Sequence, residues 1–177
     1  MSSTACKPIR VAGLVGDSIT DGPGLRLTVF VQGCPHHCEG CHNPQTWPFA
    51  GGTWMQPEEI FQKLRQNPLS DGMTLSGGEP FCQCEALLPL AKQVRAAGYS
   101  LYAYTGYTFE ALYRMEDPFV RKLLQQLNVL VDGPFLLSQR NLTLPFRGSE
   151  NQRILDVPRS LAAKEAVWTD DPDWFPL

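Results

Sequence analysis

Short apolar segments alternate with amphipathic helical segments along most of the chain, and this alternation limits the fold more than any other feature of the sequence. Strands are predicted at 27–33, 73–76, 100–105, 128–132 and 153–157. Helices are predicted at 57–66, at 84–97, and at two short segments between Thr108 and Leu127 that Asp117-Pro118 separates. This order is typical of a mainly parallel sheet with right-handed crossovers. The strands are too few for a closed eight-stranded barrel, so we expect an α/β fold built as an open or partial (β/α) barrel.

The 177 residues are enough for one domain with a buried core, and 1–177 is predicted to be a single domain. The core is expected at about 13–157. The first two dozen residues are rich in glycine and are expected to be irregular. Residues 158–177 form a C-terminal extension that ends in WTDDPDWFPL. Its tryptophans and acids are suited to docking a partner, but a frayed and partly disordered end is the expectation.

The composition argues against binding to nucleic acid or a membrane. A net charge of −3 leaves no basic surplus to neutralise phosphates. The N-terminus lacks the apolar core of a secretory signal, and no run approaches the roughly 18 apolar residues of a membrane span. A cytoplasmic protein is expected. In that compartment its six cysteines are more often metal ligands or reactive thiols than a disulfide framework.

Three cysteines follow the first predicted strand with the spacing Cys34-x3-Cys38-x2-Cys41. Thiolates this close in a loop can face one metal centre. A structural zinc site would need a fourth ligand, such as one of the neighbouring histidines. An iron–sulfur cubane held by three cysteines instead leaves one iron open to a substrate, whereas an electron-carrier ferredoxin uses four cysteines for each cluster. The spacing alone leaves zinc and the open cluster as alternatives.

Other candidate residues also follow the predicted strands. Gly77-Gly78-Glu79 follows the second strand, Thr105-Gly106-Tyr107 the third and Asp132-Gly133 the fourth. The carboxyl ends of parallel strands meet at one edge of a sheet, where the loops of such folds carry their chemistry. These segments are therefore predicted to lie near Cys34.

The other cysteines are expected to be ordinary thiols. Cys82 and Cys84 lie at the predicted start of a helix, and two ligands are too few for another cluster. Cys6 lies in the N-terminal segment and receives the same interpretation.

The segments DGPGLRLTVFVQGCPHHCEGCHNPQTW and MTLSGGEPF resemble the radical S-adenosylmethionine activases of glycyl-radical enzymes. YTGYTFEAL, VLVDGPF and FRGSENQRI more narrowly resemble the small activating proteins of anaerobic (class III) ribonucleoside-triphosphate reductase. The resemblance extends from about Gly13 to Val157, and the motifs occur in the family's order.

The resemblance implies a [4Fe–4S] cluster whose open iron binds S-adenosylmethionine. One electron from the reduced cluster would release methionine and a 5′-deoxyadenosyl radical, which would take a Cα hydrogen from one glycine of the reductase. The expected electron donor is a reduced flavodoxin or ferredoxin. An activase of pyruvate formate-lyase or another glycyl-radical enzyme is the alternative within this class. A zinc-stabilised binding module is the alternative outside it.

The resemblance also implies roles for individual residues. The cluster ligands are Cys34, Cys38 and Cys41. The residues expected at S-adenosylmethionine are Gly40, Cys41, His42, Gly77, Gly78, Glu79 and Thr105, with Tyr107 beside the adenosine. Arg147, Ser149 and Asn151 are expected to orient its carboxylate or ribose. Asp132 is expected to face the glycine loop of the partner, unless it caps a helix or turn.

Two positions depart from the wider superfamily. Gly40 stands where many members have an aromatic residue against adenine, so backbone contacts would take over there. Tyr104 replaces an acid before the threonine of the third strand, which argues against a cation site. Asp21 to Gly24 and Arg26 are expected to form a turn beside the cluster.

Overall fold

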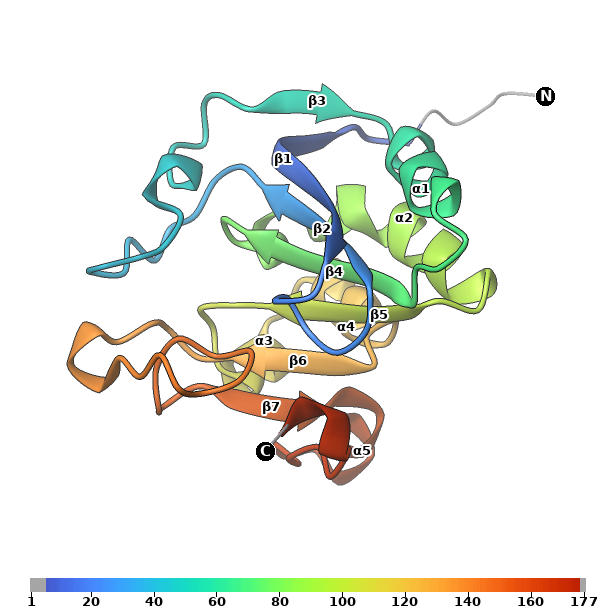
Figure 1. Cartoon of the computed structure of the whole chain (residues 1–177). Coiled ribbons are helices and arrows are strands. Elements are labelled where there is room, and N and C mark those ends of the chain that lie inside the picture. The colour runs from blue at the N-terminus through green and yellow to red at the C-terminus, as the bar shows by residue number, and fades with distance from the viewer. Residues whose placement is uncertain (1–5, 176–177) are drawn as a thin grey trace.

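The computed structural model describes residues 6–175 and arranges their strands in one seven-stranded sheet of order β3-β1-β2-β4-β5-β6-β7 (Figure 1). The strands are β1 (Ile9–Ser18), β2 (Arg26–Val31), β3 (Thr53–Met55), β4 (Gly72–Gly77), β5 (Ser100–Tyr104), β6 (Val129–Asp132) and β7 (Arg153–Asp156). The α-helices are α1 (Pro57–Gln66), α2 (Cys84–Ala96), α3 (Phe109–Arg114), α4 (Pro118–Leu124) and α5 (Val157–Ala163). The 3-10 helices are η1 (Pro44–Thr46), η2 (Pro80–Gln83), η3 (Leu137–Gln139) and η4 (Pro172–Trp174).

The central strands β2, β4, β5 and β6 are parallel, which confirms the predicted α/β class with a mainly parallel sheet. At both margins of the sheet, the strands pair in antiparallel fashion. β1 pairs with β2 and β3, and β7 pairs with β6. The prediction of an irregular N-terminal region is wrong for β1. Within this strand Ile9 and Val11 are buried while most of the second half is exposed, so the apolar alternation is too short to recognise.

The predicted helices are present, and local capping explains where they begin. Pro57 opens α1 behind a capping box formed by Gln56 and Glu59. Thr108 accepts a hydrogen bond from Ala111 N at the start of α3, as expected. Asp117-Pro118 separates α3 from α4. None of the helices within residues 6–175 is long and apolar enough to cross a membrane.

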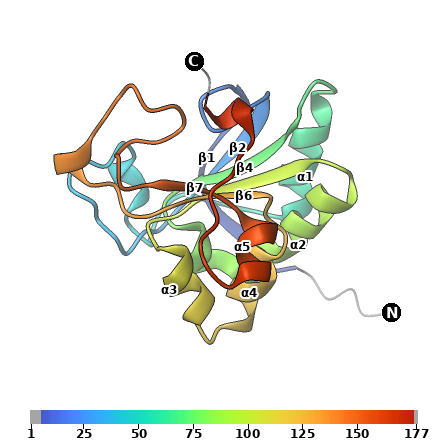
Figure 2. The same ribbon diagram turned by 90° about the horizontal axis from the view of Figure 1, so that it is seen from below.

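The two faces of the central sheet differ in composition. α1, α2, α3 and α4 lie on one side, where strand residues such as Leu27, Val29 and Leu75 join the apolar core (Figure 2). We call the opposite side the open face. Its central side chains are Thr28, Phe30, Thr74, Ser76, Tyr102 and Tyr104, placed side by side by the strand register.

The C-terminal part of the described chain is folded, contrary to the expected frayed end. After α5 the chain runs back along β7, since Asp156 N donates to Val167 O at 2.9 Å and Thr169 N donates to Ile154 O at 3.0 Å. It then crosses to the open face, where η4 lies (Figure 2). Trp174, in this 3-10 helix, is fully buried. This part of the chain is held on the sheet because burial of the Trp174 ring removes a large apolar surface from water.

Candidate functional site

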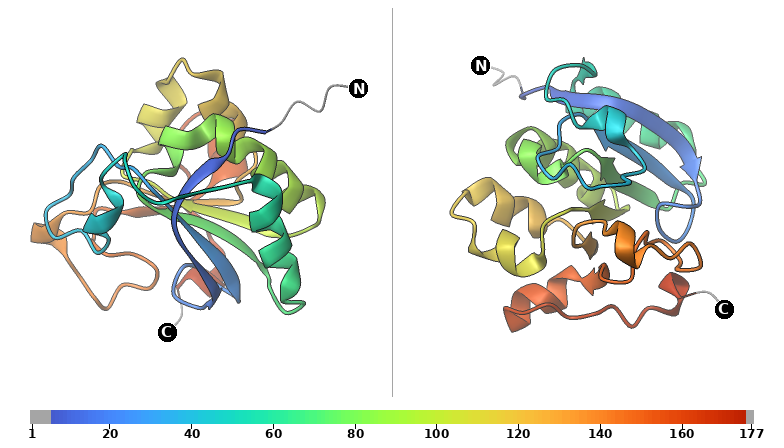
Figure 3. Two further views of the ribbon diagram at one scale, coloured as in Figure 1. Left: turned by 90° about the horizontal axis from the view of Figure 1, so that it is seen from above. Right: turned by 90° about the vertical axis from the view of Figure 1, so that its left-hand side faces the viewer.

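The loops that follow β2 and β6 project beyond the same edge of the sheet (Figures 1 and 3). The first holds the cysteines. Its base is fixed by backbone hydrogen bonds from Gly33 N to Thr46 O at 2.7 Å and from Cys34 N to Trp47 O at 3.0 Å. The side chain of Gln32 adds hydrogen bonds to carbonyls within the loop. The cysteine loop is therefore anchored to the sheet at the end of β2.

The three predicted cluster cysteines line one cavity of about 110 Å³, which we call the cysteine cavity. The other strand ends also contribute to its wall, as the parallel order predicted. The lining residues include Cys34, Cys38, Cys41, Gly77, Gly78, Thr105, Gly106, Gly133, Phe135 and Gln152. Segments far apart in the sequence thus meet around the thiols.

The thiols suit an iron–sulfur cluster. Backbone N–H groups approach the sulfurs, including Asn43 N at 3.4 Å from Cys41 Sγ, and such hydrogen bonds tune iron–sulfur clusters. Burial raises the pKa values of Cys34 and Cys38, so a bound metal is what would make them thiolates. Within residues 6–175, no three His, Cys, Asp or Glu side chains converge tightly enough to hold a single ion. Cys34, Cys38 and Cys41 all line the cysteine cavity, so a cluster bound there would have these three residues as its ligands.

A second cavity of about 360 Å³ adjoins the first on the open face, and we call it the open-face cavity. Its volume is in the range of small-molecule sites. Its floor includes Phe30, Ser76 and Tyr104, and its rim is formed by the loops that follow β2 and β6. The remaining lining residues are Thr20, Asp21, Cys41, His42, Asn43, Phe135, Leu144, Phe146, Arg147, Gly148 and Gln152. Cys41, Tyr104, Phe135 and Gln152 line both cavities, so a ligand on the open face lies beside the cysteines.

Arg147 supplies the open-face cavity with a cation that is partly without partners. Its Nη1 donates to Gln152 O at 2.8 Å, while the buried Nε has no hydrogen-bond partner among the described residues. Desolvation by burial lowers the pKa of Arg147, and an anionic ligand would offset this cost. The arrangement suits a carboxylate, which guanidinium groups bind with two parallel hydrogen bonds.

Glu79 is fully buried, and its carboxylate is occupied by protein donors. Oε2 accepts from His36 Nε2 at 2.7 Å and from Gly106 N at 2.9 Å. Oε1 accepts from Phe81 N at 3.0 Å, and the Thr105 hydroxyl lies 3.0 Å from both oxygens. A carboxylate offers about four acceptor sites. Through these hydrogen bonds Glu79 joins strand-end loops around the cysteines, and its expected place at S-adenosylmethionine stays a prediction.

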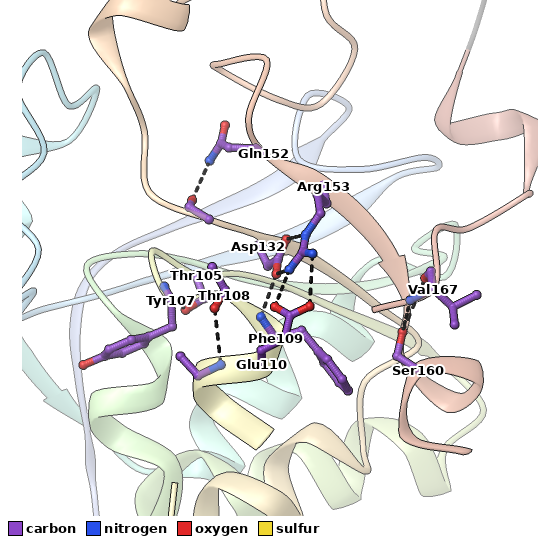
Figure 4. Close-up of polar contacts among 12 residues, drawn as sticks. Thr105, Tyr107, Thr108, Phe109, Glu110, Asp132, Gln152, Arg153, Ser160 and Val167 are labelled. Carbon is purple, nitrogen blue, oxygen red and sulfur yellow. Dashed lines mark hydrogen bonds and ion pairs between the residues drawn. The ribbon is translucent and has the colours of Figure 1, made fainter. Parts of the chain in front are cut away.

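Asp132 is fully buried and is not among the residues that line the two cavities. It accepts from Phe109 N at 2.7 Å and pairs with Arg153, whose Nε and Nη2 lie 2.9 and 2.6 Å from its oxygens (Figure 4). Arg153 also pairs with Glu110. These contacts match the alternative in which Asp132 caps a helix, and the expected role toward the glycine loop of the partner stays a prediction.

Other expected residues are divided between the cavities and their supports. His42 lines the open-face cavity, whereas Gly40 lines neither cavity. Ser149 is buried and accepts from Leu136 N at 3.2 Å. Asn151 donates to Pro134 O at 2.8 Å, but its Oδ1 is buried without a partner among the described residues.

The glycines and the turn before β2 have structural explanations as well. A Cβ on Gly78 would lie 2.4 Å from Gly33 O, and Gly77 has φ +88°. Both positions therefore require glycine whether or not a ligand binds.

The expectation that Arg26 lies beside the cluster is wrong, because it begins β2, at the opposite end from Cys34. It is buried against Tyr102 and donates to Thr74 Oγ1 at 2.7 Å.

Sequence reasoning missed Phe135 and Gln152, which line both cavities. Gln152 Oε1 accepts from Gly148 N at 2.9 Å, and its Nε2 donates to Gly133 O at 3.2 Å. The carboxamide thus ties the two ends of the loop after β6. Gln152 lies inside the RGSENQR segment, which pointed to a functional region. Nothing in the sequence distinguished Gln152 from its neighbours in that segment.

Comparisons with known proteins agree with this geometry. The model of a family described as a 4Fe–4S single cluster domain matches residues 20–155. The anaerobic ribonucleoside-triphosphate reductase-activating protein of Haemophilus influenzae is 34% identical over 146 residues, which cover 77% of this chain and 90% of the relative. The chain belongs to this family of reductase-activating proteins. Membership confirms the predicted family and favours the cluster over the zinc alternative.

Other members and neighbours were found as well. The activating protein of Vibrio cholerae is 36% identical over 144 residues, with coverage of 77% and 90%. A pyruvate formate-lyase-activating enzyme of Clostridium pasteurianum is 42% identical over 94 residues, but these cover 50% of this chain and 40% of that enzyme. QueE from Escherichia coli has a TM-score of 0.48 and 20% identity over 57% of this chain and 54% of that structure.

Proposed function

We propose that this chain is the activase that installs a glycyl radical on anaerobic ribonucleoside-triphosphate reductase. The supporting observation is the adjacency of the cysteine cavity and the open-face cavity, which share Cys41. Cys34, Cys38 and Cys41 would hold the cluster beside the open-face cavity, where the cosubstrate would bind. We also assign the fold to the partial barrel of radical S-adenosylmethionine enzymes, with the open face as its interior.

Cys34, Cys38 and Cys41 would hold the [4Fe–4S] cluster, which would supply the electron that cleaves S-adenosylmethionine into methionine and the 5′-deoxyadenosyl radical that would take a Cα hydrogen from a glycine of the reductase. The chain's own residues bind and orient. Arg147 receives the carboxylate of the cosubstrate. Phe135, Phe146 and Tyr104 provide aromatic surface for the adenosine and limit access of water to the cavity. Glu79 holds the loops around the thiols in place.

The remaining partners follow from the same proposal. Reduction of the cluster requires a one-electron donor protein, for which a reduced flavodoxin or ferredoxin is proposed. A cytoplasmic location and the absence of nucleic-acid binding stay predictions from composition. The division of the chain into a single domain also stays a prediction.

A radical-transfer assay tests the proposal. Anaerobically reconstituted protein is mixed with S-adenosylmethionine, a one-electron reductant and the large subunit of the reductase. Electron paramagnetic resonance should detect a glycyl radical in the reductase. Pyruvate formate-lyase in place of the reductase serves as the comparison, and a radical formed there alone would instead assign the chain to the alternative partner.

A further inference from the structure

The C-terminal segment, defined here as residues 167–175, lies beyond the region that the cluster-domain family matches. The hydrogen bonds to Ile154 and Asp156 attach its beginning to β7. Its end, η4, lies on the open face beside the loop between β1 and β2 (Figures 2 and 3). The segment therefore spans the open side of the sheet from one margin toward the other.

Trp174 packs against Phe146, a residue in the wall of the open-face cavity. Its ring centroid lies 4.9 Å from that of Tyr102 and 5.3 Å from that of Phe146, which lines the cavity. The loop between β1 and β2 is adapted to this contact, because a Cβ on Gly22 would lie 3.1 Å from Trp174 Cη2. Trp174 is fully buried although it is close to the end of the described chain.

Trp168 makes a matching contact with the next cavity residue. The Arg147 guanidinium carbon lies 5.5 Å from the centroid of the Trp168 ring, within the range of a cation–π interaction. Two tryptophans of the C-terminal segment thus contact two consecutive residues of the cavity wall, Phe146 and Arg147.

These two wall residues need outside support. They lie in the long loop after β6, which has no strand or α-helix of its own between Gly133 and Gln152. Phe146 has φ +56°, a left-handed conformation that disfavours residues with a side chain. Its carbonyl accepts from the Tyr104 hydroxyl at 2.8 Å, and Trp174 covers its ring. Such a conformation persists where the surroundings hold it.

We infer that the C-terminal segment positions Phe146 and Arg147 and thereby sets the affinity of the open-face cavity for its ligand. This inference rests on the proposed function, in which that ligand is S-adenosylmethionine. Trp174 and Trp168 are positioning residues, since neither lines the cavity.

Titration of S-adenosylmethionine into the reconstituted full-length protein tests the inference. Trp174→Ala should weaken the affinity about ten-fold, the change that corresponds to roughly 1.4 kcal/mol. Trp174→Phe should stay within about two-fold of the original protein, because it keeps an aromatic ring at the contact. Trp168→Ala, at a half-exposed position that tolerates change, should weaken binding about three-fold. Iron content should be unchanged in all three variants.

Leu127→Ala is the matched control, because this buried side chain packs in the apolar core of the helix-covered face. It should lower the midpoint of thermal unfolding without changing the affinity. Unchanged affinity in Trp174→Ala and Trp168→Ala would overturn the inference, and so would an equal loss in Leu127→Ala, since the effect would then be general destabilisation. Failure of the unaltered protein to bind S-adenosylmethionine would instead contradict the proposed function.

Discussion

The His36 Nε2 and Glu79 Oε2 atoms lie 2.7 Å apart and join the cysteine loop to the segment that follows β4. Both side chains are shielded from water, with Glu79 fully buried. His36 lies between two cluster cysteines in sequence, and Gly106 and Thr105 bind the same carboxylate from the segment after β5. One buried carboxylate therefore fixes three strand-end loops around the cysteine cavity.

Glu79→Gln should reduce stability and cluster retention together. The amide keeps the shape of the side chain but replaces one acceptor oxygen with a donor, so buried donors lose a partner at a cost of about 2 kcal/mol. Urea unfolding and iron content after gel filtration measure the two effects. Glu85→Gln, at an exposed carboxylate that pairs with Lys7, is the control and should change neither. Normal stability and iron with weakened cosubstrate affinity would show that Glu79 contacts the ligand after all.

Asp132→Asn should destabilise the fold and leave radical transfer intact in the protein that remains folded. The substitution removes one of the two carboxylates that pair with Arg153, and because Arg153 keeps Glu110 as a partner we expect a cost of about 2 kcal/mol. Glu110→Gln should cost less, because that carboxylate is partly exposed. Thermal unfolding ranks the two variants. A stable Asp132→Asn that no longer activates the reductase would argue for the partner-facing role expected from the sequence.

The sequence predicted the sheet edge better than the direction of the side chains on it. Buried apolar strands are readable because they are continuous, and parallel topology brings their ends together. The cysteines, Gly77 and Thr105 were therefore placed near one another correctly. The same argument could not say that Asp132 points beneath α3, because both directions leave a carboxylate at a strand end.

Contacts between distant segments were the part that the sequence did not reveal. Trp174 near the C-terminus looked like a frayed residue, since the pocket that buries it is formed by Tyr102, Phe146 and the backbone of Gly22. Likewise β1 was missed because pairing with β2, rather than its own pattern, makes it a strand. Such features depend on tertiary contacts that local patterns do not encode.

Replacement of any cluster cysteine should abolish the metal centre. Cys34→Ala, Cys38→Ala and Cys41→Ala should each lose most of the roughly four irons of a [4Fe–4S] cluster and with them the cleavage of S-adenosylmethionine. Iron and sulfide analysis of anaerobically reconstituted protein measures the loss. Cys82→Ala is the control, because its thiol lines neither the cysteine cavity nor the open-face cavity. One zinc and no sulfide in the unaltered protein would contradict the cluster itself.

Removal of the Arg147 charge should weaken cosubstrate binding without loss of the cluster. Arg147→Met keeps much of the apolar length but no donors, so the carboxylate would lose a charge-assisted hydrogen bond of about 2 kcal/mol. Equilibrium titration should report an affinity lower by more than ten-fold at unchanged iron content. Arg140→Met is the comparison, since Arg140 lines neither cavity. Equal affinities in the two variants would remove Arg147 from the site.

Gly40→Ala tests whether the turn between two cluster cysteines needs glycine for its backbone. Cys41 N donates to Cys38 O at 3.1 Å, so Gly40 is the third residue of a tight turn, and its φ of +74° is the value that a type II turn requires there. An added Cβ would also lie 2.9 Å from Leu137 Cδ1. Gly98 has φ +87° with nothing within 4 Å of an added Cβ.

Both Gly40→Ala and Gly98→Ala should therefore cost about 1 kcal/mol of unfolding free energy from the backbone conformation. Gly40→Ala alone should also lose iron on gel filtration, because relief of its strain moves Cys38 relative to Cys41. Unfolding curves and iron content measured on the two variants side by side separate these effects. Full iron retention in Gly40→Ala with weaker cosubstrate binding would mean that the backbone at Gly40 contacts the ligand, as its place in the motif suggested.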